Sequence, residues 1–399
     1  MSHRSSGILP FGTVVLLLAG CVGAADDPPG DPGRDPTVDP DPPRVEHRIP
    51  WDPAQPTEPP GDAGTEPPPD SGTEPPPDPG TEPPPDAGTE PPPPPDPIAA
   101  LGPLPPEMAG LRWPEQPRIE REVTVTNVED LRREAGVSGT RIHVRGAVGG
   151  DVSVNADDIE ILADDATRLG RVSIGHGVSR VRIAGGTYTD IYISIPAEFY
   201  PSVRYRPEWM VEDVTIEDVN VHSSNMAFEI RGRRIAIVRS RVTAARYSVW
   251  CGDTGPMQSE DVILHENVFD SAGPEATVRL VQVLRSATVS NVLVNTAKHN
   301  YRIHGTSDLN YAANNLLINT GVMLGRMPGD DLGRVWFDDN VFHHTAPDLF
   351  NPDTGIDMLH ATGNVAYTNV WSCFYCPSPQ PGWTLASNRT EPYRPPPSY

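Results

Sequence analysis

The chain after residue 98 is predicted to form a parallel β-solenoid, in which short strands of successive coils stack into continuous sheets. Asparagine followed by an apolar residue recurs every 24 or 25 residues, at positions 267, 291, 315, 340 and 364. Short stretches such as Ile235-Ala236-Ile237-Val238 are rich in β-branched residues, and the 3.6-residue periodicity of amphipathic helices is missing. A period in the twenties with two or three short strands per repeat is typical of solenoids.

Residues 1–21 are predicted to be a targeting segment. Arg4 precedes an apolar run, Ile8 to Leu18, that is too short to span a bilayer comfortably. The run ends in Leu18-Ala19-Gly20-Cys21, which resembles the lipobox of bacterial lipoproteins. This resemblance implies export and acylation of Cys21, and the following Val22 implies the outer membrane or cell surface of a Gram-negative bacterium. The alternative is an ordinary signal peptide with a chance cysteine.

Residues 22–97 are predicted to form a disordered, proline-rich stalk. Most of the 49 prolines lie before residue 100, and Thr-Glu-Pro-Pro begins at positions 57, 65, 73, 81 and 89. The stalk carries 18 acidic residues and 3 arginines, which is most of the net charge of −23. Proline and like-charge repulsion oppose a core, so the stalk is a tether, either a selected spacer or a tolerated linker. The acidic balance argues against nucleic acid as a partner.

The predicted domain, residues 98–376, begins with a cap and is followed by a proline-rich tail, residues 377–399, that is expected to wrap or fray. Asn127 is predicted to start a short amphipathic helix that ends near Gly136, before a strand at 141–144. Such a helix would cover the otherwise unpaired edge of the first coil.

The asparagine corners resemble those of the right-handed parallel β-helix of pectate lyases and related polysaccharide-active proteins. In that fold, stacked asparagines fill one corner and their amides bond the coils above and below. The resemblance implies that the five asparagines are structural, since a lone buried amide would be costly. Two earlier corners fit the same phase, at Asp218-Val219 and Arg241-Val242.

Aligning the coils on these corners predicts a polar stripe on one face. In Phe228-Glu229-Ile230-Arg231 and Tyr301-Arg302-Ile303-His304, alternation turns the apolar side chains inward and the polar ones outward. Arginine pairs with uronate carboxylates and can assist proton abstraction beside them. The alternative is a solvated strand face. The candidate catalytic residues are Arg279, Arg302 and His304, and the candidate substrate-binding residues are Glu229, Arg231 and Arg326.

One coil carries an insertion beside this stripe. The chain runs 32 residues from Thr187 to Val219, against 24 for a regular coil. Aromatic rings and arginines in such a loop suit sugar stacking and acidic groups, although they could equally pack onto the coil. The additional candidate binding residues are Tyr200, Arg204, Tyr205, Arg206 and Trp209.

Calcium is a cofactor that related proteins hold with aspartates, and one coil contains Asp330, Asp331, Asp338 and Asp339. Turns between strands explain these residues equally well, so no metal ligand is assigned. A disulfide between Cys373 and Cys376 is compatible with export and would leave Cys251 free.

The sequence therefore predicts a monomeric, surface-displayed β-helix that binds an acidic polysaccharide. Cleavage by a polysaccharide lyase or glycoside hydrolase activity stays open, because no acid–base pair stands out. The competing hypothesis is a non-catalytic adhesin or envelope-structural protein.

Overall fold

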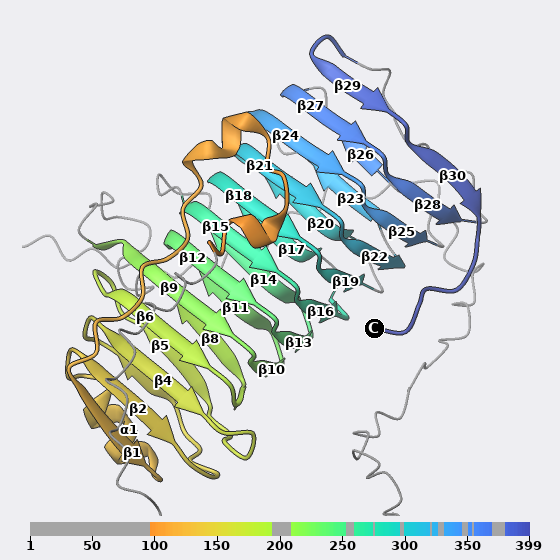
Figure 1. Ribbon diagram of the computed structural model, residues 1–399. Coiled ribbons are helices and arrows are strands. Elements are labelled where there is room, and N and C mark those ends of the chain that lie inside the picture. Colours follow the sequence, from red (N-terminus) through yellow and green to blue (C-terminus); the bar gives the residue numbers. More distant parts are fainter. Residues whose placement is uncertain are drawn as a thin grey trace, which may run out of the picture. The chain divides into compact units, whose positions relative to one another are not determined.

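The computed structural model describes residues 96–193, 209–252, 259–273, 276–295, 299–319, 321–325, 331–344, 350–352, 355–368 and 380–399. Within them the chain forms a right-handed parallel β-solenoid (Figure 1), which confirms the predicted fold class. The targeting segment, Cys21 and almost all of the stalk lie outside the described residues. Among the residues described, no helix has the length and apolar character needed to cross a membrane.

Three parallel sheets run along the solenoid. Sheet A consists of β1 (Arg121–Val125), β2 (Thr140–Val144), β4 (Ile159–Ala163), β6 (Ser179–Ala184), β9 (Val211–Glu217), β12 (Gly232–Val238), β15 (Ser259–His265), β18 (Val283–Val289), β21 (Asp308–Ala313), β24 (Leu332–Asp338), β27 (Ile356–Thr362) and β29 (Trp383–Ala386). Sheet B consists of β3 (Val152–Val154), β5 (Arg171–Ile174), β8 (Asp190–Ile193), β11 (Met226–Ile230), β14 (Tyr247–Gly252), β17 (Ala276–Val281), β20 (His299–His304), β23 (Gly321–Leu324) and β26 (Phe350–Pro352). Sheet C consists of β7 (Thr187–Tyr188), β10 (Asn220–Ser223), β13 (Arg241–Ala244), β16 (Val268–Ser271), β19 (Val292–Asn295), β22 (Leu316–Asn319), β25 (Val341–His344), β28 (Val365–Thr368) and β30 (Arg389–Pro392).

A regular coil passes from sheet A through sheet C to sheet B, and apolar side chains fill its interior. The four residues expected to point inward, Phe228, Ile230, Tyr301 and Ile303, are fully buried in the core. The ring of Tyr301 in sheet B lies 6.2 Å from that of Phe337 in sheet A. Sheets A and B therefore face each other across the core, and their outer faces point in opposite directions.

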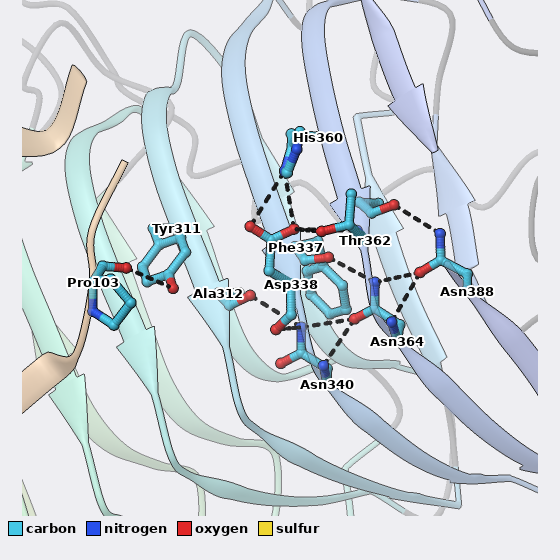
Figure 2. A network of polar contacts seen from close by, with 11 residues as sticks. Pro103, Tyr311, Ala312, Phe337, Asp338, Asn340, His360, Thr362, Asn364 and Asn388 are labelled. Carbon is cyan, nitrogen blue, oxygen red and sulfur yellow. Dashed lines mark hydrogen bonds and ion pairs between the residues drawn. The ribbon is translucent and has the colours of Figure 1, made fainter. Parts of the chain in front are cut away.

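A ladder of buried asparagines holds the corner between sheets A and C (Figure 2). From Asn291 onward, each Oδ1 accepts hydrogen bonds from the backbone N–H and the side-chain amide of the asparagine one coil earlier. Asn340 Nδ2, for example, donates to Asn364 Oδ1 at 3.1 Å and to the Ala312 carbonyl at 3.0 Å. The residue before each ladder position, such as Glu266 with φ of 56°, adopts the left-handed conformation that makes the bend. The predicted structural role is confirmed, and Asn388 extends the ladder.

The two earlier corners were each predicted one residue out of phase, and the structure corrects them. Arg241 pairs in register with Val268, so Ser240 occupies the position of Asn267 and bonds to its Oδ1 through a backbone N–H at 2.9 Å. Val219 occupies the corresponding position one coil earlier. Because neither serine nor valine is characteristic of this corner, the sequence did not show which residue occupies it in these two coils.

The first coil is capped as expected. Helix α1 (Val128–Glu134) begins at Asn127, whose side chain accepts a hydrogen bond from the Asp130 backbone N–H at 2.9 Å. Leu131 is fully buried against the core, so the helix closes the open end of the solenoid.

At the other end, residues expected to belong to the tail contribute a further coil. Strand β29 pairs with β27, and β30 pairs with β28. The remaining residues turn back along the outside of sheet C, where the Arg394 carbonyl accepts from His343 Nδ1 at 2.8 Å and its guanidinium lies over the Tyr367 ring. The regular alternation of Trp383–Ala386 and the continued asparagine spacing account for this extra coil.

The outer face of sheet A changes character along the solenoid. Its first coils carry ion pairs between neighbouring strands, with Arg182 bonded to both Glu160 and Glu217. From β12 onward the same row of positions becomes apolar; it holds Ala236, Ile263, Ala287, Tyr311 and Trp336.

A strap formed by residues 98–113 covers this apolar part of sheet A. It contains two short 3-10 helices, Ala99–Leu101 and Pro106–Gly110, and it crosses several coils (orange in Figure 1). Leu101 and Met108 are fully buried against the sheet, and Tyr311 Oη donates to the Pro103 carbonyl at 3.3 Å (Figure 2). The strap is therefore part of the domain.

Candidate functional site

The predicted polar stripe lies on the outer face of sheet B, opposite the strap. Strand register places one residue of each strand in a single row, which we call the outer row. Consecutive positions are ~4.8 Å apart, the spacing of neighbouring strands. From β8 to β23 the outer row consists of Tyr192, Glu229, Trp250, Arg279, Arg302 and Met323.

Two of the predicted residues are less accessible than the sequence indicates. Arg302 and His304 alternate with the inward residues of β20, so they belong to the outer face, yet they are only 7% and 2% exposed. A solvated strand face does not describe them. Trp250 and Met323 also interrupt the expected run of charges.

Arg279 is held by uncharged groups. Its Nε donates to His304 Nε2 at 2.8 Å, and one Nη donates to Tyr247 Oη at 3.0 Å. The guanidinium carbon lies 4.4 Å from the centre of the Trp250 ring, a cation–π arrangement. Tyr247 meets Trp250 edge to face at 4.8 Å, so both rings brace the arginine. The guanidinium is thus fixed in orientation while its other N–H groups stay available to an acceptor.

His304 remains neutral in this setting. Burial, followed by the positive charges of Arg279 and Arg302, lowers its pKa from 6.5 to about 3. The neutral ring accepts from Arg279 through Nε2, which a protonated ring could not do. His304 therefore serves to orient Arg279 at neutral pH.

The carboxylates of the outer face are already paired. Glu229 Oε1 lies 2.7 Å from an Nη of Arg231, and both side chains are largely buried. Burial lowers the pKa of Arg231, and the Glu229 carboxylate opposes that shift. Asp190 pairs with Arg171 at 3.5 Å and accepts from Ser223 Oγ at 2.5 Å. Within the described strands of sheet B these are the acidic residues, and each faces an arginine.

Several predicted binding residues lie outside the described residues: Tyr200, Arg204, Tyr205, Arg206 and Arg326. The insertion leaves sheet B after Ile193, directly beyond Tyr192 of the outer row. At its other end the Trp209 carbonyl accepts from the Gly177 backbone N–H, and the Trp209 ring meets His176 at 6.4 Å. Trp209 thus packs against a neighbouring coil.

Of the four aspartates considered for calcium, Asp330 lies outside the described residues, and the other three do not gather at one point. Asp331 precedes β24 and Asp338 ends it, so a whole strand of about 20 Å separates them. The Asp338 carboxylate bonds to His360 and Thr362 (Figure 2), while Asp339 is the left-handed corner residue before Asn340. No group of three or more acidic, histidine or cysteine side chains suited to a metal occurs in the described ranges. Calcium binding stays a prediction, as does any disulfide of Cys373 and Cys376, which lie outside those ranges.

Two contributors to the site were not among the sequence candidates. Tyr247 and Trp250 support Arg279. The signal for Tyr247 is its position in the same strand, three residues before Trp250. Cys251, between Trp250 and the next corner, is buried in the core, and burial raises its thiol pKa to about 12.

No protein-family model matches this chain, and no curated protein sequence does. Similar solved structures include an alginate lyase from Paenibacillus sp. str. FPU-7, at 9% identity, 68% coverage of this chain, 99% of that chain, and a TM-score of 0.38. A surface protein and adhesin of Streptococcus pneumoniae is 10% identical; the match covers 71% of this chain and 79% of that chain, with a TM-score of 0.37. An exopolygalacturonase from Thermotoga maritima is 9% identical; the match covers 71% of this chain and 94% of that chain, with a TM-score of 0.33. Similarity this distant carries no argument about a ligand.

Proposed function

We propose that the outer face of sheet B binds an anionic polysaccharide and that Arg279 is the anchor for one of its carboxylates. The observation that carries this proposal is the Arg279 environment, in which every contact among the described residues is with an uncharged group. A guanidinium fixed in this way retains its full charge and free N–H donors. Charge-assisted hydrogen bonds to a carboxylate are the interaction for which it is best arranged.

Binding without cleavage is the activity that this geometry supports best. Glu229 and Asp190 are both engaged by arginines, and His304 uses Nε2 to hold Arg279. None of these groups is poised to remove a proton from a sugar at neutral pH. We further propose that the protein is a monomer, that acylated Cys21 anchors it to the outer membrane or cell surface, and that the stalk of residues 22–97 is its tether.

Binding of the full chain in detergent to immobilised polygalacturonate, alginate, hyaluronan and neutral dextran tests this proposal. We expect binding to at least one of the three anionic polymers and none to dextran. Arg279→Ala should weaken that binding tenfold or more, since a charge-assisted hydrogen bond contributes about 1.5–3 kcal/mol.

Arg239→Ala is the matched control, because Arg239 lies at the corner of sheets A and C and already pairs with Asp218. It should change the affinity less than about twofold. Absence of binding to all three polyanions, or equal losses in the two variants, would contradict the proposal. Release of unsaturated sugar products would contradict the non-catalytic interpretation.

A further inference from the structure

We propose that the outer face of sheet C is a binding track for proline-rich segments in the polyproline II conformation, occupied by the chain's own segment Tyr393–Tyr399 until a proline-rich segment of a partner protein replaces it. The proposal is independent of polysaccharide binding on sheet B. It rests on the residues of sheet C that the segment covers, on the spacing of the buried residues within the segment, and on the contacts that hold it.

One outward-facing row of sheet C changes from polar and exposed to apolar and buried along the solenoid. His222 and Thr243, on β10 and β13, are exposed. Val294 and Ile318, on β19 and β22, alternate with residues of the core and so point away from it, yet they are only 5% and 4% exposed. A part of the chain outside the sheet therefore covers them. This row, which we call the sheet C row, consists of His222, Thr243, Asp270, Val294, Ile318, His343 and Tyr367.

The segment Tyr393–Tyr399 crosses the sheet C row where its residues are buried. It follows β30 and returns past β28 and β25 toward β16 (Figure 1). The Arg394 carbonyl accepts a hydrogen bond from His343 of β25. Burial, followed by the Asp270 carboxylate of β16, raises the pKa of Tyr399, so the far end of the segment lies near that strand. The apolar part of the row, on β19 and β22, lies between these two contacts.

The length of the segment matches the polyproline II conformation. This helix rises ~3.1 Å per residue, so the five residue steps from Arg394 to Tyr399 span ~15 Å. The three strand intervals from β25 to β16 measure ~14 Å. Residues 395–397 are all proline, which fixes φ near the value that this helix requires, and the segment forms neither a strand nor a helix with hydrogen bonds of its own.

Burial within the segment repeats every third residue. Tyr393 and Pro396 are partly buried, whereas the residues beside them are exposed; three positions further, Tyr399 is 48% exposed. A polyproline II helix has three residues per turn, and one turn of ~9 Å is close to two strand intervals of ~4.8 Å. One side of such a helix can therefore contact alternate strands. A ring at every third position is the feature that a partner segment would share.

Rings and a cation, rather than strand pairing, hold the segment on the sheet. The Tyr367 ring stacks on His343 at 4.9 Å, and the Arg394 guanidinium lies 3.8 Å from the centre of the Tyr367 ring. An Nη of Arg394 donates to Tyr367 Oη at 2.5 Å. Proline-rich ligands dock on aromatic-lined surfaces in several peptide-binding domains. Because a polyproline II helix has no internal hydrogen bonds to break, a partner with arginine before prolines can exchange with this segment.

Binding of a fluorescent peptide with the sequence of residues 391–399 to the full chain tests the proposal. The linked segment competes at a roughly millimolar effective concentration, so the wild-type chain should bind the peptide weakly. Tyr393→Ala/Tyr399→Ala removes two ring contacts of the linked segment and should strengthen peptide binding by about tenfold or more. Ser398→Ala is the matched control; it alters an exposed residue and should bind the peptide as the wild type does.

Two further changes test the surface and the conformation that the peptide uses. Added to the double variant, Ile318→Asn should weaken peptide binding about tenfold, because it buries an amide beneath the prolines. Thr243→Asn should not, since Thr243 is an exposed position of the same row beyond the segment. A peptide with glycine at positions 395–397 should bind about fivefold more weakly than the proline peptide, because its conformation is no longer preorganised.

Equal binding of the peptide by the wild type and the double variant, or binding by neither, would overturn the proposal. Unfolding of the double variant would do so as well, because the segment would then be part of the fold and not an exchangeable occupant. Equal losses from Ile318→Asn and Thr243→Asn would show that the peptide binds elsewhere, and equal binding of the proline and glycine peptides would show that polyproline II is not recognised.

Discussion

Arginines lie on the outer faces of both sheet A and sheet B, and Arg279 of sheet B differs from the arginines of sheet A in the groups that hold it. On sheet A, Arg234 Nε lies 2.6 Å from Asp213 Oδ1, and the same residue-to-residue pairing recurs between Arg180 and Asp158. On sheet B, Arg279 rests on a neutral histidine, a tyrosine hydroxyl and an indole ring. An arginine bound to a carboxylate joins two coils, whereas an arginine held by neutral groups keeps its charge for a ligand.

The largest effect expected at a fixed, neutral pH is on sheet A. Arg234→Ala removes the counter-ion of Asp213, a residue only 3% exposed, and should lower the free energy of unfolding by about 3 kcal/mol. Urea denaturation measures this change. Replacing both residues by leucine should be less damaging than the single change, since no buried charge is then left unpaired. A loss below about 1 kcal/mol for Arg234→Ala would show that the pair is not structural.

The next effect is a pH dependence that originates on sheet B. The folded pKa of His304 is about 3 and its ordinary value is 6.5, so between these pH values the unfolded chain binds the extra proton. This site should therefore lower the free energy of unfolding by about 1.4 kcal/mol for each pH unit of acidification across that window. His304→Gln keeps an acceptor for Arg279 and should remove this slope. Parallel curves for the two proteins would disprove the assignment.

A smaller effect on stability is expected for Arg279→Ala. No carboxylate of the described residues loses its partner, and the hydrogen bonds that are lost join Arg279 to uncharged groups, so the cost should be about 1 kcal/mol. The same urea experiment compares it with Arg234→Ala. Equal destabilisation by Arg279→Ala and Arg234→Ala would show that Arg279 stabilises the fold as much as an arginine that is paired with a carboxylate.

The smallest effect belongs to an exposed pair. The side chains of Arg239 and Asp218 are 47% and 55% exposed, so water screens their attraction. Arg239 also pairs with Glu217, but Glu217 keeps Arg182 as a counter-ion when Arg239 is removed. Arg239→Ala should change stability by less than about 0.5 kcal/mol. A larger loss in thermal or urea unfolding would mean that exposure does not separate the strong pairs from the weak ones.

The sequence revealed those features that repeat with a fixed period. Alternation placed Phe228 and Ile303 in the core, and the 24-residue spacing identified the asparagine ladder as structural, because both depend on short-range geometry. The contacts of Arg279 depend on pairing with residues 32 positions earlier and 25 later. Coil lengths vary, as the 27 residues between Ser240 and Asn267 show, so such pairs could not be aligned from sequence.

The strap escaped prediction for a related reason. Leu101 and Met108 follow no period, and their burial arises from a sheet face that forms more than a hundred residues later in the chain. Nothing near them in the sequence marks the apolar row at Ala236 and Tyr311 as needing a cover. The same holds for the ion pairs of sheet A, which link residues about 21 positions apart across neighbouring coils.

The strap also decides how tension would enter the domain. Asp96, the first residue that the structure describes, lines a surface pocket together with Trp113 and Arg234 of β12. If residues before Asp96 form the proposed tether, a force on that tether would reach the strap first and would have to peel Leu101 and Met108 from sheet A. The asparagine ladder and the outer face of sheet B, where we propose that the glycan binds, would then carry that force only after the strap had detached.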